Sequence, residues 1–219
     1  MKINCSNSEG IEEKFIVECM DQNVKIKICG ITLLEDAFMA TALGADALGF
    51  VFARSKRHIS LSEARKIISR LPAFVTAVGV FMNQSFEDVR RIADETGIDV
   101  IQLHGSETPE YCEQLDRPII KRFAVQPDDT AAMLASRMKT YTVAAYLLDP
   151  GAGEGKVFDW EKAVGLDFRL IIAGGLTHDN VRQVIQLVKP YGVDVSSGVE
   201  RSPGRKDREK MKRFIEEVK

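Results

Sequence analysis

The stretch VAAYLLD, residues 143–149, is an apolar run that ends in an acid. Two further stretches, VTAVGVF at residues 75–81 and RLIIAG at residues 169–174, have the same apolar character. A strand with one solvated face alternates apolar and polar residues, whereas a strand buried on both faces is apolar almost throughout. The three stretches therefore predict strands of a parallel sheet that is covered on both sides.

Short β-branched runs alternate with segments of helical period from Val24 onward. The expected strands are residues 24–29, 47–52, 74–81, 100–104, 119–125, 143–149, 169–173 and 193–196. The expected helices are residues 33–43, 61–71, 86–96, 109–115, 128–138, 159–164, 179–188 and 206–218, of which the sixth is short.

Eight strand–helix units with short connections can close on themselves. We therefore expect the α/β class and a (β/α)8 TIM barrel as a single domain over residues 24–219. A doubly wound open sheet is the alternative, and the eighth unit favours closure. Residues 1–23 are expected to form an N-terminal extension, to which we assign no function.

The composition is that of an ordinary globular protein, with 45% hydrophobic and 28% charged residues in a chain of 219. A formal charge of -2 gives no general attraction for nucleic acid or for an anionic membrane. The sequence shows neither a bilayer-spanning apolar run nor a signal-peptide pattern, so we expect a cytoplasmic protein. The four cysteines are scattered without a CxxC pair, which argues against a zinc knuckle or a disulfide framework.

Polar residues at the carboxyl ends of barrel strands are the first candidates for function, because that face carries the chemistry of such barrels. Cys29 ends the first expected strand and Asp149 ends the sixth. A lone cysteine is more often a small buried hydrophobe, and an aspartate at a strand end can simply cap the next element. Facing one another across a barrel, the thiol and the carboxyl group would form an acid/base couple for moving protons on a sugar.

Glycine turns follow the last two strands, at Gly174, Gly175 and Gly198. Glycine lets backbone N–H groups approach an anion, and the loops after strands 7 and 8 are the common phosphate site of this fold. The alternative is that these glycines only relieve tight turns. The pattern predicts a phosphate site.

Two further polar residues have competing interpretations. The planar fork of Arg57 could clamp a carboxylate, although a solvated charge is the simpler interpretation of a basic run such as RSKRH. His104 ends the fourth expected strand without a second ligand at metal spacing, which favours a structural histidine over a metal ligand or proton donor.

An ordered series of motifs runs from Val24 nearly to the end of the chain. The motifs are KICGIT (27–32), GADALGFVF (44–52), SKRHIS (55–60), VGVF (78–81), IQLHG (101–105), FDW (158–160), AGGL (173–176) with NV (180–181), and DVSSGVE (194–200) with PG (203–204) and KD (206–207). With these motifs the chain resembles the phosphoribosylanthranilate isomerase family.

The resemblance implies a role for each candidate. Cys29 corresponds to the family's general base and Asp149 to its general acid, and Arg57 corresponds to the arginine that contacts the anthranilate carboxylate. Phosphate-binding groups carry over to Gly174, Gly175, Ser197 and Gly198. Asp194 lies in the matching DVSSG segment, where it is expected to help shape the substrate pocket.

The implied reaction is the Amadori rearrangement of N-(5-phosphoribosyl)anthranilate to 1-(2-carboxyphenylamino)-1-deoxyribulose 5-phosphate in tryptophan biosynthesis. It is expected to require no metal, nicotinamide or flavin. The expected partner is a small phosphorylated substrate, without nucleic acid or membrane, and the protein is expected to be a monomer or a homodimer. The alternatives are a barrel that only binds a phosphosugar, or a related barrel enzyme such as indole-glycerol-phosphate synthase or a histidine-pathway isomerase.

Two loops depart from the family pattern. The segment FARSKR after the second strand lacks the usual proline-containing stretch and is one residue shorter, which puts the reach of Arg57 in doubt. The loop PGAGEGK after the sixth strand is also shorter, with Glu154 in place of the family's hydroxyl residue. A shorter lid is expected to alter closure or substrate affinity.

Overall fold

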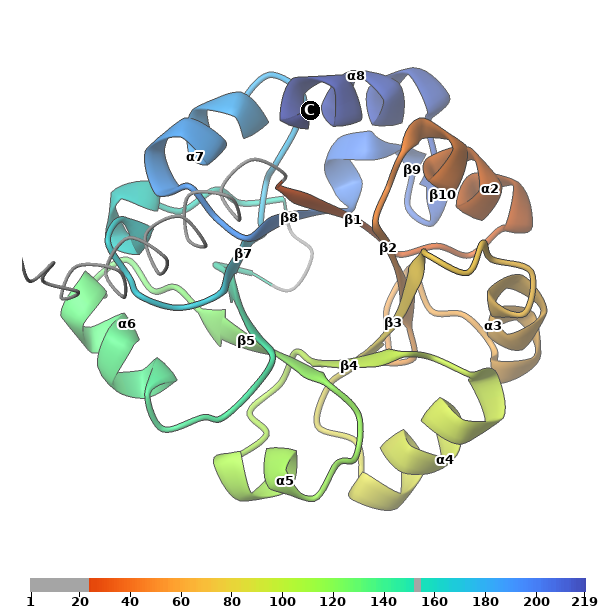
Figure 1. The fold of residues 1–219 in the computed structure, drawn as a ribbon, viewed down its shortest axis with the longest axis horizontal. Helices are drawn as coiled ribbons and strands as arrows, with labels where there is room; N and C mark the ends of the chain where they lie inside the picture. Colours follow the sequence, from red (N-terminus) through yellow and green to blue (C-terminus); the bar gives the residue numbers. More distant parts are fainter. Residues whose placement is uncertain (1–23, 152–154) are drawn as a thin grey trace, which may run out of the picture.

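The computed structural model describes residues 24–151 and 155–219, which form a closed barrel of eight parallel strands surrounded by helices (Figure 1). The strands are β1 (Lys25–Cys29), β2 (Ala47–Val51), β3 (Thr76–Phe81), β4 (Val100–Leu103), β5 (Ile119–Ala124), β6 (Ala145–Asp149), β7 (Leu170–Ile172) and β8 (Gly192–Val195). Strand β1 pairs with both β2 and β8, so the sheet has no free edge. The expected barrel is confirmed, and the open sheet is excluded.

The helices form the outer layer of the barrel (Figure 1). They are α2 (Leu34–Leu43), α3 (Leu61–Ile68), α4 (Phe86–Thr96), α5 (Pro109–Glu113), α6 (Ala131–Met138), α7 (Val181–Val188) and α8 (Arg208–Val218). A single 3-10 turn, η1 (Trp160–Ala163), stands where the short sixth helix was expected. In the part of the chain that the structure describes, no helix is both long and apolar enough to cross a bilayer.

Several helix boundaries differ by one to three residues from those expected, and at the last helix the physical reason is clear. The last helix was expected to begin at residue 206, but α8 begins at Arg208, because Asp207 is its N-cap and accepts a hydrogen bond from the amide of Lys210. Lys206 instead lies in a small antiparallel hairpin of β9 (Glu200–Ser202) and β10 (Arg205–Lys206), which follows the 3-10 turn η2 (Ser197–Val199). The expected N-terminal extension lies outside the described residues, and the boundary at residue 24 stays a prediction.

Side chains of each strand alternate between the helices and the barrel interior. Ile26 and Ile28 of β1 are fully buried in the large cluster that includes Ala37 and Ala40 of α2. A second, smaller cluster of strand residues fills the interior; its buried members are Val78, Ile120, Ala145, Leu147, Ile171 and Ala173. Towards the carboxyl ends of the strands, a pocket above this cluster is lined by the polar side chains of Cys29, Gln102, Asp149 and Asp194 together with the apolar side chains of Val51 and Val80.

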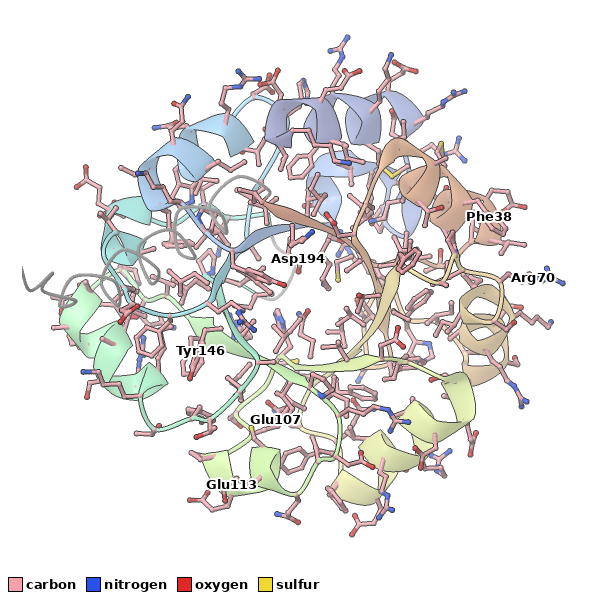
Figure 2. The ribbon with its side chains drawn as sticks, viewed as in Figure 1. Phe38, Arg70, Glu107, Glu113, Tyr146 and Asp194 are labelled. Atoms are coloured by element: carbon pink, nitrogen blue, oxygen red, sulfur yellow. The ribbon has the colours of Figure 1, made fainter. Side chains whose placement is uncertain are left out.

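A buried ion pair ties the loop after β4 to β5 on the outer side of the barrel. The ammonium group of Lys121 lies 2.9 Å from the Glu107 carboxylate and donates to the carbonyl oxygen of Gly105 at 2.7 Å. The other carboxylate oxygen of Glu107 accepts the amide of Asn83 at 2.8 Å. Both charged side chains are almost completely buried, and Figure 2 shows Glu107 between the barrel and α5. Each charge therefore depends on the other for compensation.

We expect Glu107→Ala to lower the free energy of unfolding by about 3–5 kcal/mol, because the variant leaves Lys121 buried without its partner. Urea titration of the purified variant measures this loss. Glu113→Ala, at the exposed end of α5, is the matched control and should change the free energy by less than about 0.5 kcal/mol. A loss for Glu107→Ala no larger than that of the control would contradict the assigned role.

Candidate active site

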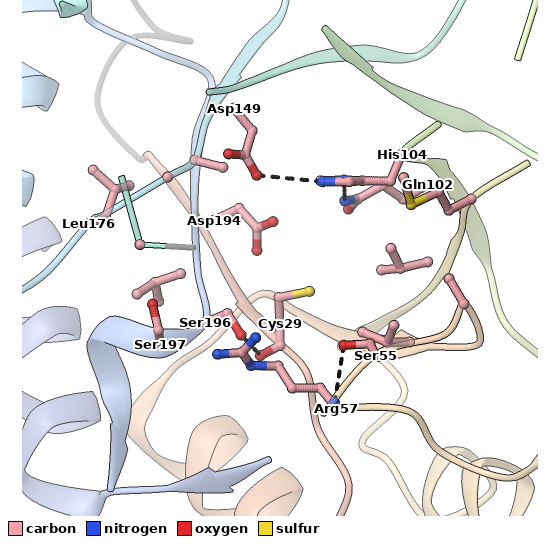
Figure 3. A pocket seen from close by; sticks show the side chains of 18 of the residues that line it. Cys29, Ser55, Arg57, Gln102, His104, Asp149, Leu176, Asp194, Ser196 and Ser197 are labelled. Carbon is pink, nitrogen blue, oxygen red and sulfur yellow. Dashed lines mark hydrogen bonds and ion pairs between the residues drawn. The ribbon is translucent and has the colours of Figure 1, made fainter. Parts of the chain in front are cut away.

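A pocket opens at the carboxyl ends of the strands and collects most of the predicted site residues (Figure 3). The predicted residues that line it are Cys29, Arg57, Asp149, Gly174, Gly175, Asp194 and Ser197. Gly198 is not among its lining residues, and it packs against the backbone carbonyl of Leu176, which a Cβ at this position would meet. Residues from loops that are distant in sequence thus share one cavity.

Cys29 and Asp149 face the same space from different walls. Cys29 ends β1 and Asp149 ends β6, so the geometry of the closed barrel places them across the pocket from each other. Figure 3 shows the sulfur of Cys29 directed into the cavity, with Asp149 on the opposite side and Asp194 between their levels. Neither group lies in the packed apolar interior.

A buried ion pair lies directly beneath the thiol of Cys29. Lys27 of β1 stands opposite Asp194 of β8 in the strand register, and its ammonium group donates to the Asp194 carboxylate at 2.9 Å. Room for this arrangement comes from Gly49 of β2, where a Cβ would lie 2.7 Å from the Cys29 sulfur and 3.0 Å from Lys27 Nζ. Glycine at this position is therefore a steric requirement of the site.

The environment of Cys29 favours the neutral thiol over the thiolate. Burial raises the pKa of Cys29, and the nearby carboxylate of Asp194 adds to the rise. The Lys27 ammonium opposes them through its charge and a hydrogen bond to the sulfur, and Lys206 opposes them more weakly, but the net pKa lies above the ordinary value. Lys27 is the main group that stabilises a thiolate here.

The environment of Asp149 favours its protonated form. Burial raises the pKa of Asp149 to about 6, although the amide of Gly151, which donates to Oδ1 at 2.9 Å, lowers it. Arg122 of β5 donates to the backbone carbonyl of Asp149 at 3.0 Å and also lowers the pKa. The carboxyl group therefore exchanges its proton near neutral pH, which suits a general acid.

His104 stands beside this acid as a neutral side chain. Its Nε2 lies 3.6 Å from Asp149 Oδ2, and its Nδ1 lies 3.2 Å from Nε2 of Gln102. Burial, with the nearby charges of Arg122, Lys27 and Lys121, lowers the pKa of His104 to about 3. If the amide of Gln102 donates to Nδ1, the imidazole carries its proton on Nε2, toward Asp149. His104 therefore lies in the pocket next to Asp149, which the interpretation as a purely structural histidine did not predict.

Arg57 reaches the pocket despite the shortened loop after β2. Its side chain passes over Gly30, which has a φ of 79° and where a Cβ would lie 2.6 Å from Arg57 Cδ. The guanidinium is held by Glu200, with Nη2 to Oε2 at 2.8 Å and Nε to Oε1 at 2.9 Å. Hydrogen bonds and charge from Glu200 raise the pKa of Arg57, although burial opposes them. The interpretation as a solvated charge was wrong.

The glycine pair after β7 lies against the loop that follows β6. Gly174 and Gly175 have φ values of 88° and 63°, and a Cβ on Gly174 would lie 2.5 Å from Pro150 Cδ. Asn180 fixes this turn, because its side-chain amide donates to the carbonyl of Gly175 at 3.0 Å and its Oδ1 accepts the amide of Thr177 at 2.8 Å. These glycines therefore have a steric role whether or not they bind phosphate.

Four charged residues around the pocket were not predicted from the sequence: Lys27, Arg122, Glu200 and Lys206. Three of them, Lys27, Glu200 and Lys206, lie within the quoted motifs. A charged residue within an otherwise apolar strand, such as Lys27, could have indicated a buried polar site. Within residues 24–151 and 155–219, no group of three or more His, Cys, Asp or Glu side chains is arranged to hold a metal ion. Glu154 of the shortened loop lies outside the described residues.

A closed barrel with a thiol, a carboxyl group and glycine turns at one rim defines an acid/base enzyme of the (β/α)8 class. The family model described as "N-(5'phosphoribosyl)anthranilate (PRA) isomerase" matches residues 26–217. The chain therefore belongs to the N-(5'-phosphoribosyl)anthranilate isomerase family, whose enzymes act in tryptophan biosynthesis.

Individual relatives agree with the family model. The N-(5'-phosphoribosyl)anthranilate isomerase of Geobacter sp. (strain M21) is 50% identical over 199 residues, covering 89% of this chain and 98% of that protein. The Thermus thermophilus phosphoribosyl anthranilate isomerase structure has a TM-score of 0.82 at 40% identity, covering 89% of this chain and 98% of the other. A related structure, described as a complex with reduced 1-(o-carboxyphenylamino)-1-deoxyribulose 5-phosphate, has a TM-score of 0.79 at 39% identity, with coverages of 89% and 98%.

The pKa of Cys29 can be measured directly by its alkylation. We expect the rate of iodoacetamide reaction at Cys29 to rise with pH to a midpoint above about 8.5, the ordinary value for a thiol. In Lys27→Met the midpoint should move higher, because the variant removes the main group that lowers this pKa. Cys29→Ser provides the blank for the other cysteines, and a midpoint below 7 would contradict the assigned environment.

Proposed function

We propose that Asp149 is the general acid and Cys29 the general base of the isomerisation of N-(5'-phosphoribosyl)anthranilate. The observation that carries this proposal is their position on facing walls of one pocket, at the ends of β6 and β1. The family membership supports the reaction, and the surroundings of the two groups support their roles. The product is 1-(2-carboxyphenylamino)-1-deoxyribulose 5-phosphate.

The substrate has two anionic ends, and the pocket has a complementary group for each. Arg57 is proposed to bind the anthranilate carboxylate, because its guanidinium lines the pocket with a fork that matches a carboxylate. The turns at Gly174, Gly175, Ser197 and Gly198 are proposed to bind the phosphate through backbone N–H groups. Asp194 shapes the wall between Cys29 and Asp149 and accepts a hydrogen bond from Lys27.

The first step opens the sugar ring. Asp149 gives its proton to the furanose ring oxygen, the bond between that oxygen and C1 breaks, and the nitrogen lone pair forms an iminium with C1. The imidazole of His104 stands 3.6 Å from the carboxyl group, which orients the acid as its charge develops. Loss of the proton leaves a carboxylate that the Gly151 amide stabilises.

The second step removes the hydrogen on C2. The iminium makes this hydrogen acidic, and the thiolate of Cys29 takes the proton while the C2–H electrons form the C1–C2 double bond of an enolamine. The enolamine then gains a proton at C1 and loses one from its C2 hydroxyl, which gives the ketone. Protons alone are moved in this route, so it needs no added oxidant, reductant or metal ion.

Replacement of either proposed catalytic residue should abolish most of the activity. Cys29→Ala and Asp149→Asn are each expected to lower kcat by about 10²–10⁴-fold, the usual contribution of a general acid or base. Steady-state assay of the purified variants measures this loss. Cys112→Ala, which removes a buried thiol of α5 away from the pocket, is the matched control.

Normal turnover by either variant would refute the assigned chemistry. Tight binding of the reduced product analogue by the unmodified protein without detectable turnover would instead indicate a barrel that only binds a phosphosugar.

The two pKa values predict the pH dependence of kcat/KM. The active form has Asp149 protonated and Cys29 ionised. Below about pH 6 the thiolate fraction falls tenfold per unit while Asp149 is already protonated, so the rate falls. Between pH 6 and the higher pKa of Cys29 the two fractions change in opposite senses and their product is constant. Above the Cys29 pKa, loss of the Asp149 proton lowers the rate again. A rate that rises steadily from pH 6 to 9 would contradict this assignment.

We also propose a monomer or a homodimer that works in the cytoplasm with no partner beyond its small substrate. A related Thermotoga maritima enzyme is described as dimeric, at 38% identity and a TM-score of 0.80. Sedimentation equilibrium of the full chain decides between the two states, and cell fractionation tests the compartment.

A further inference from the structure

Glu200, the first residue of β9, has no part in the proposed proton transfers, yet it is the most heavily bonded carboxylate beside the pocket. Its side chain is only 4% exposed. It accepts hydrogen bonds from Arg57, from Nζ of Lys206 at 2.9 Å and from the amide of Gly204 at 3.2 Å. A buried carboxylate with this many donors is fixed in one orientation.

The contact with Arg57 uses one edge of the guanidinium, and among the residues that the structure describes the other edge has no further hydrogen-bond partner. Nε and Nη2 of Arg57 bind the two oxygens of Glu200, at 2.9 Å and 2.8 Å. The remaining edge, formed by Nη1 and the second hydrogen of Nη2, has the same spacing of donors and suits a second carboxylate. Since Arg57 lines the pocket, a ligand can approach the guanidinium there. A long side chain held in this way loses less freedom when it binds.

Lys206 is the third charged residue of this cluster, beside Arg57 and Glu200. Its side chain is fully buried, and its ammonium group donates to Glu200, to the carbonyl of Cys29 at 2.6 Å and to the carbonyl of Ser196 at 3.3 Å. Burial lowers the pKa of Lys206, while the charges of Glu200 and Cys29 oppose this effect. Arg57 and Lys206 share the carboxylate of Glu200, and both also interact electrostatically with Cys29. The same cluster connects the end of β1 with the turn after β8.

We propose that Glu200 is a positioning residue that confers selectivity for ligands carrying a carboxylate on the aromatic ring, by holding Arg57 in its binding orientation. This inference rests on the proposed contact between Arg57 and the substrate carboxylate. Without Glu200, the guanidinium loses its fixed edge and samples other rotamers. Selectivity then falls, while the groups that bind phosphate and move protons stay in place.

The test compares two ligands that differ only in the carboxylate. One is reduced 1-(o-carboxyphenylamino)-1-deoxyribulose 5-phosphate, and the other is the same molecule without the carboxyl group. Calorimetry on the full chain gives the selectivity ratio, which is the Kd of the ligand without the carboxyl group divided by the Kd of the carboxylated ligand. We expect Glu200→Gln to reduce this ratio at least tenfold, mainly by weakening the carboxylated ligand. Glu209→Gln, an exposed neighbour on α8, is the matched control and should leave the ratio unchanged.

A merely structural role of Glu200 predicts a different result, namely that both ligands weaken equally and the ratio stays constant. That result overturns the inference. Arg57→Ala should lower the ratio as far as Glu200→Gln does or further, and the double variant should show no additional loss, because both changes remove one contact. Additive losses in the double variant would also contradict the inference.

The same measurements separate this inference from the proposal on which it rests. If Arg57→Ala keeps the wild-type ratio, the proposed carboxylate contact fails; if Arg57→Ala loses selectivity and Glu200→Gln keeps it, only the inference fails. Should Glu200→Gln not fold, Glu200→Asp keeps the charge beside Lys206 but withdraws it from Arg57. A reduced ratio in that variant supports the inference, and an unchanged ratio overturns it.

Discussion

The pairing of β1 with β8 is the constraint on which the rest of this structure depends. It closes the barrel and places Lys27 opposite Asp194, so that two opposite charges meet inside the protein at 2.9 Å. Neither charge could remain buried alone. Their contact stabilises the polar layer below the pocket, and it supports the end of β1, where Cys29 emerges. Closure also brings the end of β6, with Asp149, to the facing wall.

This layer bears on how one small pocket could serve the opposite roles proposed for Cys29 and Asp149. Burial raises the pKa of both Cys29 and Asp149, which is favourable for an acid and unfavourable for a thiolate base. The Lys27 ammonium partly corrects the imbalance on the cysteine side. In the proposed mechanism the reaction corrects it further, because ring opening creates a positive iminium next to the thiol, and a positive charge stabilises a thiolate. The proposed base is thus most effective after the proposed acid has acted.

Much of the fold was predictable because most strands are short runs rich in apolar residues, such as TAVGVF of β3 and AYLLD of β6. Observed helix starts differ from the expected ones mainly where a capping residue determines the first turn, as Asp207 does for α8. The periodicity of apolar residues does not indicate such a cap. The hairpin of β9 and β10 was missed because its residues ERS and RK carry no strand-like pattern. Its stability comes instead from long-range contacts of Glu200 and Lys206.

The site was predictable to the extent that its residues stand at strand ends or in recognised motifs, as Cys29, Asp149 and the glycine turns do. The ion-pair partners could not be predicted from the sequence, because Lys27 and Asp194 are 167 positions apart and Arg57 and Glu200 are 143 positions apart. Only the folded barrel shows which charge faces which. Arg57 is the clearest case, since its basic run suggests a solvated surface and its salt bridge to Glu200 reveals a built contact.

The most direct measurement follows a deuterium atom placed on C2 of the substrate through a single turnover. Proton abstraction by Cys29 predicts that the full-length enzyme removes this label as the ketone forms. Cys29→Ala should remove it at least about 100-fold more slowly while binding the reduced product analogue with an unchanged Kd. Loss of the C2 label at the unmodified rate in Cys29→Ala would contradict the assignment of the thiol as the base.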